Sequence, residues 1–271
     1  FLWSMAIGAW GGNGFVKVLD GQFMRNGSPY YYIGTNLWYG PILGSTGEGG
    51  NRERLGYELD SLKSIGINNL RILAGADAGS KNTNSVYPYL QSEAGHLNDT
   101  LLVGLDYFLA ELDKRDMVAV IYLNNAWEWS GGYGFYLKSA GKGESPTARN
   151  NGYGAYTKYA SEFVSDDKAK SLFWNYVKQI VGRTNSITGK PYKDDPAIMS
   201  WQVCNEPRSF SSEGKNDLAR FIHETARIIK ETDPNHLVST GSEGSVGCEN
   251  DMALYEQIHA DQLIDYLTIH I

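Results

Sequence analysis

The sequence predicts an α/β fold in which strands and helices alternate around a parallel sheet. Apolar runs of strand length are separated by segments with helical spacing along most of the chain. The long connections consistently follow strands and not helices. Alternating units of this kind form parallel sheets with right-handed crossovers, and loops that expand at the carboxyl ends of strands are typical of a (β/α)8 TIM barrel. About six β/α units of such a barrel are expected here, preceded by an N-terminal β-hairpin.

The first half of the chain begins with the hairpin and continues with two β/α units. Asp20-Gly21 is a preferred two-residue hairpin turn, and Gly66 is typical of a helix C-cap. The predicted elements are, in order, a hairpin over 15–24, a strand over 30–34, a helix over 55–65, a strand over 69–73 and a helix over 101–114.

The second half adds strands and helices around one long loop that is rich in Gly and aromatic residues. The strand predicted over 117–123 is apolar throughout and is expected to be buried on both faces. The other predicted elements are a loop over 124–161, a helix over 167–181, a strand over 197–203, a helix over 217–232 and strands over 237–240 and 264–271.

Six strands leave such a barrel open, because closure needs eight. The chain starts without an initiator Met and ends inside its last predicted strand, and an open sheet would expose unpaired edges that natural proteins avoid. We therefore expect residues 15–271 to be a (β/α) barrel domain truncated after strand six, with a genuine six-stranded doubly wound fold as the alternative. Residues 1–14 are expected to be a structural lead-in or the remnant of a secretory signal peptide.

Composition excludes several classes of protein. A formal net charge of -7 provides no basic face, so nucleic acid and anionic membrane surfaces are poor partners. No stretch approaches 18 uninterrupted apolar residues, so no membrane span is expected. The chain contains 18 Tyr and 7 Trp, whose rings suit both sugar stacking and core packing.

The metal and disulfide chemistry expected of this chain is sparse. Its two cysteines, Cys204 and Cys248, are too few for a disulfide scaffold or a zinc framework, and they either pair or are buried thiols. Five His residues without metal-ligand spacing argue against a catalytic metal. No cofactor is expected.

The most informative motif is an apolar strand that ends abruptly in Asn205-Glu206-Pro207. Proline cannot continue the ladder of backbone hydrogen bonds, so the strand stops there. In barrel enzymes the active site lies at the carboxyl ends of the strands, which is where this carboxylate is expected. The alternative is a Glu that only caps a turn.

Together these segments resemble the endo-β-1,4-mannanases of glycoside hydrolase family 5. The resemblance covers essentially the whole chain, in the order of the family. The segments that carry it are 34–38 (Gly-Thr-Asn-Leu-Trp), 70–72 (Leu-Arg-Ile), 124–132 with its Asn-Asn and Trp-Glu-Trp-Ser-Gly-Gly, 195–208 with its Asn-Glu-Pro-Arg, 239–244 (Ser-Thr-Gly-Ser-Glu-Gly) and 268–271 (Thr-Ile-His-Ile).

The resemblance implies a retaining mechanism with two carboxylates. Glu206 would be the general acid that protonates the departing oxygen and then the base that activates water, which requires a raised pKa. The family's nucleophilic Glu ends the seventh strand, which lies beyond the end of this chain. Glu243 could replace it, but its Ser-Glu-Gly turn favours a loop-shaping or substrate-contacting role.

The resemblance also implies substrate-binding residues around Glu206. Arg71 would orient the nucleophile, and its alternative is a structural salt bridge. Asn205 would contact the sugar 2-hydroxyl. His270 matches a family His beside the cleavage site, although an isolated His in an apolar strand is more often a core residue. Arg208 would reach a sugar on the leaving-group side or be a solvated side chain.

Trp38, Trp127 and Trp129 lie in loops that follow strands and are candidate sugar-stacking platforms. At least one of the three is expected to belong to the core. Trp201 lies in the middle of a strand, where packing is the expected role.

The expected function is therefore endo-acting hydrolysis of mannan, glucomannan or galactomannan by a monomeric enzyme that is secreted or extracellular, the periplasm and the cell surface included. An endo-β-1,4-glucanase on the same barrel is the alternative within enzymes. A non-catalytic carbohydrate-binding relative is the alternative outside them. The fragment by itself is expected to be inactive.

Overall fold

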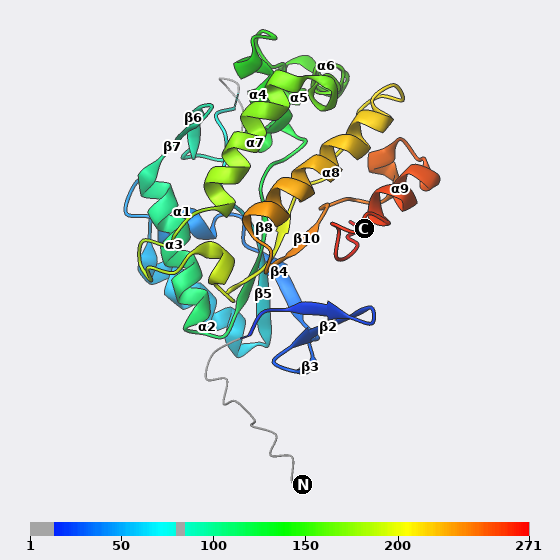
Figure 1. The fold of residues 1–271 in the computed structure, drawn as a ribbon. Coiled ribbons are helices and arrows are strands. Elements are labelled where there is room, and N and C mark those ends of the chain that lie inside the picture. Colours follow the sequence, from blue (N-terminus) through cyan, green and yellow to red (C-terminus); the bar gives the residue numbers. More distant parts are fainter. Residues whose placement is uncertain (1–13, 80–84, 271) are drawn as a thin grey trace.

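The computed structural model describes residues 14–79 and 85–270. Its centre is a five-stranded sheet in the order β10-β9-β8-β5-β4, and every neighbouring pair is parallel (Figure 1). The strands are β4 (Ile33–Asn36), β5 (Ile67–Leu73), β8 (Val118–Tyr122), β9 (Ile198–Gln202) and β10 (Leu237–Ser239). This order and direction are those of consecutive strands of a (β/α)8 barrel, so the predicted fold class is confirmed.

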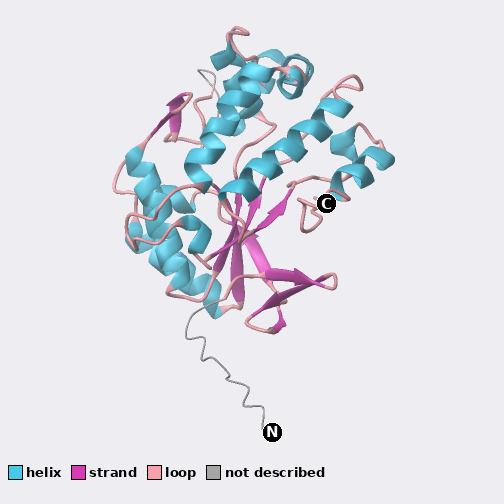
Figure 2. Ribbon diagram, viewed as in Figure 1, coloured by secondary structure: helices cyan, strands magenta, loops and turns pink. Residues whose placement is uncertain are grey.

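Helices cover the outer face of this sheet (Figure 2). The longer ones are α2 (Arg52–Ser64), α3 (Asp99–Asp113), α7 (Asp167–Val181), α8 (Lys215–Thr232) and α9 (Met252–His259). Several start at side-chain caps, since Asn51, Asn98, Asp166 and Asp251 accept hydrogen bonds from backbone N–H groups of the first turn. Alternation along β5 puts Leu70 and Ile72 into the core beneath these helices.

The predicted hairpin is confirmed. Strands β1 (Lys17–Leu19) and β2 (Gln22–Arg25) pair antiparallel around Asp20-Gly21, and β3 (Ser28–Pro29) extends them to three strands. This small sheet lies at the end where the parallel strands begin, because Lys17 Nζ donates to the Asn235 carbonyl and Arg25 pairs with Asp116. The lead-in predicted over 1–14 lies outside the described residues except for its last member.

The loop predicted over 124–161 is wrong in part, because it contains three helices. These are α4 (Gly132–Ala140), α5 (Ala148–Asn151) and α6 (Tyr153–Ala160). Helix α4 contains two glycines and two tyrosines, which lower helix propensity, yet its residues from Gly132 to Leu137 are all buried. Tertiary packing therefore stabilises a helix that local preference opposes.

The strand predicted over 264–271 is also wrong for the residues that the structure describes. Residues 264–270 form no strand, although the Asp265 N–H donates to the carbonyl of Val238 at the edge of β10. Short elements that were not predicted are α1 (Gly40–Gly44), β6 (Gln91–Glu93), β7 (His96–Leu97) and the 3-10 turns Glu128–Ser130, Phe163–Ser165, Tyr192–Asp194 and Ser245–Cys248.

Two predictions about buried side chains are settled. Cys204 and Cys248 are buried free thiols and do not pair. Trp201 is fully buried and its indole N–H donates to Asp233 at 2.7 Å, so its packing role is confirmed. Within residues 14–79 and 85–270, none of the helices is long and apolar enough to cross a membrane.

Candidate active site

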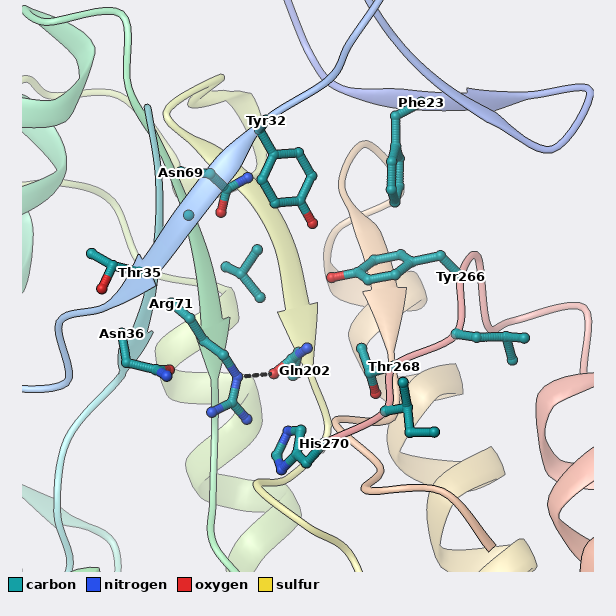
Figure 3. Close-up of a pocket in the computed structure, with 14 residues that line it drawn as sticks. Phe23, Tyr32, Thr35, Asn36, Asn69, Arg71, Gln202, Tyr266, Thr268 and His270 are labelled. Carbon is teal, nitrogen blue, oxygen red and sulfur yellow. Dashed lines mark hydrogen bonds between the residues drawn. The ribbon is translucent and has the colours of Figure 1, made fainter. Parts of the chain in front are cut away.

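A cavity of about 410 Å³ opens where β5, β8 and β9 end. Its lining brings together six of the eight site residues predicted from the sequence, all except Trp127 and Arg208. The residues that line it are Asn36, Trp38, Arg71, Tyr122, Trp129, Asn205, Glu206 and His270. A second pocket of about 410 Å³ extends from it across the inner face of the sheet and shares Asn36, Arg71 and His270 (Figure 3).

Glu206 occupies a strained turn directly after β9. Its backbone is left-handed, with φ at 53°, and its N–H donates to the Gly241 carbonyl at 3.0 Å. A Cβ at Gly241 would lie 1.8 Å from the Cys204 carbonyl oxygen, so only glycine lets the two post-strand loops approach this closely. The turn aims the Glu206 carboxylate into the cavity instead of along the strand.

Both oxygens of the Glu206 carboxylate have a donor. The indole N–H of Trp127 donates to Oε2 at 2.7 Å, and His270 Nδ1 lies 2.8 Å from Oε1. The hydrogen bond from His270 lowers the pKa of Glu206 below its usual range, and the bond from Trp127 adds to this against the opposing effect of burial. The shift is thus downward, opposite to the raised pKa predicted for a general acid.

Arg71 projects from β5 into the cavity and is held by amides and an aromatic face. Its Nε donates to Gln202 Oε1 at 2.8 Å (Figure 3), and its Nη2 donates to Asn205 Oδ1 at 3.0 Å. The guanidinium also lies 4.3 Å from the centre of the Tyr122 ring. Burial lowers the pKa of Arg71, but a guanidinium stays protonated in proteins. The structure thus places a fixed cation beside Glu206, and none of the carboxylates within residues 14–79 and 85–270 forms a direct ion pair with it.

Asn205 has its side-chain amide held from both ends. Its Oδ1 accepts from Arg71, and its Nδ2 donates to Asn125 Oδ1 at 3.0 Å. These contacts fix which end is oxygen and which is nitrogen. One N–H of Asn205 remains to donate to a group bound in the cavity.

The three candidate tryptophans divide into two kinds. Trp38 is 41% exposed and lines the cavity, and Trp129 also lines it while packing against the cluster of Leu73, Ala76 and Tyr122. Trp127 is half-buried against the main core, as expected for at least one of them. Its ring lies nearly parallel to that of Tyr156, and its N–H holds Glu206.

Arg208 is not a freely solvated side chain. Its Nη2 donates to Glu243 Oε2 at 2.7 Å, and its guanidinium lies 5.2 Å from the Trp127 ring. The ion pair between Arg208 and Glu243 thereby links the loops after β9 and β10. This pairing favours the loop-shaping interpretation of Glu243 over that of a nucleophile.

Sequence reasoning missed Gln202 and Tyr122, which hold Arg71 in place. Gln202 could have been predicted, because an amide at the end of a buried strand needs a hydrogen-bond partner. Tyr122 shares the inward face of β8 with Val118 and Val120, so alternation along the strand would have placed it. Across residues 14–79 and 85–270, no group of three or more His, Cys, Asp or Glu side chains is arranged to hold a metal ion.

Comparison with known proteins places this site in a family. The model described as "GH family 5 beta-mannosidase-like" matches residues 13–271. The chain is 31% identical over 236 residues to the putative mannan endo-1,4-β-mannosidase 4 of Arabidopsis thaliana, covering 87% of this chain and 53% of that protein. It is 30% identical to mannan endo-1,4-β-mannosidase 1 of rice, covering 89% and 51%. The chain thus spans about half the length of the curated relatives it matches.

Solved structures give the same result. A family 5 mannosidase from Rhizomucor miehei superposes with a TM-score of 0.85 at 34% identity, covering 95% of this chain and 62% of the other. The endo-1,4-β-mannanase of the same organism superposes with a TM-score of 0.73 at 25% identity, covering 95% and 71%. The match of sequence model, relatives and fold establishes that the chain belongs to glycoside hydrolase family 5.

Proposed function

We propose that the complete protein containing this chain is an endo-acting, retaining hydrolase of β-1,4-mannosidic linkages. The observation that carries the proposal is Glu206, whose carboxylate faces a cavity with sugar-sized room while two donors fix its orientation. The mannan endo-1,4-β-mannosidases among its relatives support the choice of substrate.

In the proposed mechanism, Glu206 protonates the glycosidic oxygen and later activates water. A retaining enzyme needs a second carboxylate about 5–5.5 Å away as nucleophile. Among the described residues, Glu206 is the one carboxylate that lines the cavity. We therefore propose that the nucleophile comes from a segment outside residues 1–271. A like charge at that distance would raise the pKa of Glu206 and offset the effect of His270.

Other residues in the cavity and beside it fit proposed roles in binding. Arg71 would keep the nucleophile anionic, and the free N–H of Asn205 would donate to the sugar 2-hydroxyl. Trp38 and Trp129 would stack on sugars to one side of Glu206. Arg208 and Trp127 would contact the leaving-group side, where their guanidinium and ring lie together.

The test compares mannohexaose with cellohexaose as substrates of the complete protein. We expect mannohexaose to be cleaved well ahead of cellohexaose, with retention at the anomeric carbon in the first product. Equal rates on the two would contradict the mannanase assignment and favour a glucanase. Tight binding of mannohexaose without turnover would favour a non-catalytic carbohydrate-binding relative.

A second candidate is an exo-acting β-mannosidase. It is favoured by the description of the matching family model and by the higher TM-score of the Rhizomucor mannosidase over the endo-mannanase of that organism. The products decide between them. Endo cleavage gives a ladder of oligosaccharides and a rapid fall in the viscosity of mannan, whereas exo cleavage gives mannose with little early loss of viscosity.

We also propose that the protein acts outside the cell, since a polymeric mannan is met there. Fractionation of the producing cells, with activity or antibody detection in the medium and envelope, checks this proposal. Recovery only from the cell interior would contradict it.

A further inference from the structure

Asn125 is a fully buried amide between the two loops that make the candidate site. We propose that Asn125 is a positioning residue that fixes the Glu206 turn and the Trp127 loop relative to one another. This inference rests on the proposed function, because Glu206 is taken as the acid/base. Asn125 itself does not line the cavity.

The first set of contacts joins Asn125 to the loop after β9. Its Oδ1 accepts from Asn205 Nδ2 at 3.0 Å, and residues 125 and 205 form an isolated parallel bridge. The backbone reinforces this junction, since the Asn205 N–H donates to the Asn124 carbonyl and the Ala126 N–H donates to the Asn205 carbonyl. The pairing between β8 and β9 is thereby resumed three positions past the end of each strand, at the residue before Glu206.

The second set of contacts joins Asn125 to the loop that carries Trp127. The same Oδ1 accepts from the Trp127 N–H at 3.2 Å, while Nδ2 donates to Ser130 Oγ at 3.1 Å. Gly132 packs over this turn with φ at 58°, and a Cβ there would lie 2.4 Å from the Asn125 carbonyl oxygen. Trp127, Ser130 and Gly132 therefore all pack around Asn125 in this turn.

One oxygen thus accepts donors from both loops, and this has a consequence for Glu206. The loop after β9 carries the carboxylate, and the other loop carries the indole that donates to it at 2.7 Å. Moving one loop against the other would lengthen that bond and rotate Asn205 away from Arg71. Displacement of about 1 Å at a reacting group can cost on the order of 100-fold in rate. Asn125 therefore acts on catalysis through Asn205 and Trp127.

Two substitutions separate positioning from mere stability. Asn125→Ala removes the shared acceptor and leaves the donors of Asn205 and Trp127 unpaired in the interior. Asn125→Asp keeps an oxygen for both donors and can accept from the Ser130 hydroxyl, while adding a negative charge near Glu206. Like charge raises the pKa of a carboxyl group, and a general acid works only when protonated. Asn125→Asp should therefore move the fall in kcat/KM at high pH to higher pH.

Asn185→Ala is a matched control. Asn185 is equally buried, its Oδ1 accepts from the backbone N–H groups of Ile187 and Thr188, and its Nδ2 donates to the Asp106 carbonyl. It lies in the connection between α7 and β9, at the opposite end of β9 from Glu206. Both alanine variants should lower the melting temperature, but only Asn125→Ala should change the site.

The experiment measures kcat/KM per folded molecule of the complete protein on mannotetraose and on an aryl β-mannoside with a good leaving group. We expect Asn125→Ala to lose about 100-fold on mannotetraose and about ten-fold on the aryl substrate, whose departing phenolate needs little protonation. Asn125→Asp should recover most of the loss. Equal values for Asn125→Ala and Asn185→Ala on both substrates would overturn the inference.

A readout without turnover keeps the two proposals separate. The NMR signal of the Trp127 indole N–H should follow the ionisation of Glu206, and its titration should change in Asn125→Ala but not in Asn185→Ala. An inactive wild-type protein with this NMR pattern would contradict the proposed function and retain the positioning role. An unchanged titration in Asn125→Ala would contradict that role whatever the activity.

Discussion

Asp106 and Glu206 are both carboxylates held by hydrogen bonds, and their surroundings differ in one respect. The Asp106 side chain is 0% exposed and accepts from Arg183, Ser186 and Tyr192, with five donor contacts between 2.6 and 3.0 Å. The Glu206 side chain is 26% exposed and has donors from Trp127 and His270. The Asp106 carboxylate is shielded from solvent by its donors. The Glu206 carboxylate can still accept a hydrogen bond on the side that faces the cavity.

The difference shows that one fold can use a buried carboxylate for stability and keep a partly exposed one available for chemistry. At Asp106, burial tends to raise the pKa, but the bonds from Arg183, Ser186 and Tyr192 together outweigh it and lower the pKa. No further partner is needed there, so the carboxylate anchors α3 to the connection between α7 and β9. At Glu206, fewer donors leave a partly exposed carboxylate that faces the cavity, as the proposed acid/base role requires.

The largest effect is expected from Glu206→Gln in the complete protein. Loss of the proposed acid/base should lower kcat/KM on mannotetraose by about 10²–10⁴-fold. The free energy of unfolding should change by less than about 1 kcal/mol, because glutamine can accept from Trp127 and donate to His270. Steady-state kinetics and urea unfolding measure the two quantities. Near-normal kcat/KM would contradict the assignment of Glu206.

The reverse pattern is expected from Asp106→Asn. Breaking a buried pair with Arg183 should lower the free energy of unfolding by about 3 kcal/mol. The kcat/KM per folded molecule should stay within about two-fold, because no donor to Asp106 lines the cavity. Denaturant titration at neutral pH provides the measurement. A large loss of kcat/KM in folded protein would remove the contrast between the two carboxylates.

A smaller effect should appear as a dependence of stability on pH. Because the folded-state pKa of Asp106 lies below its unfolded value near 4, the stabilisation is present above pH 4 and is lost as pH falls through the folded pKa. Asp106→Asn should therefore lose less stability than wild type between pH 4 and pH 2. Melting temperatures recorded across that interval check this. Parallel curves for the two proteins would show that Asp106 does not contribute.

Much of the fold was predictable because its strands and outer helices carry strong local patterns. The strand predicted over 117–123 matches β8, and the helix predicted over 167–181 matches α7 residue for residue. Helix α4 was missed because its stability comes from packing: Tyr133, for example, stacks on Phe163 at 4.1 Å between ring centres. Residues 264–270 carry an apolar pattern, but a strand also requires a paired neighbour, and local pattern does not reveal one.

Part of the site was predictable for a similar reason. The polar Asn205-Glu206 pair at the end of an apolar strand is visible in sequence, whereas the roles of Arg71 and Asn205 were predicted from the resemblance to the family. The role of Trp127 was not visible, because stacking and donation of an indole N–H use the same residue type. The lowered pKa of Glu206 depends on His270, which is 64 positions away in sequence and contributes through spatial contact.

The N-terminal hairpin sets a practical limit on how this protein can be produced. Val16 and Tyr30, which flank it, pack against Val118, Val120 and Met199 on the inner face of the sheet. A recombinant chain that starts after Tyr30 would expose these side chains to solvent and would be prone to aggregate. Affinity tags and cleavage sites therefore belong before Gly14. The hairpin then stays packed at the end of the sheet where the parallel strands begin.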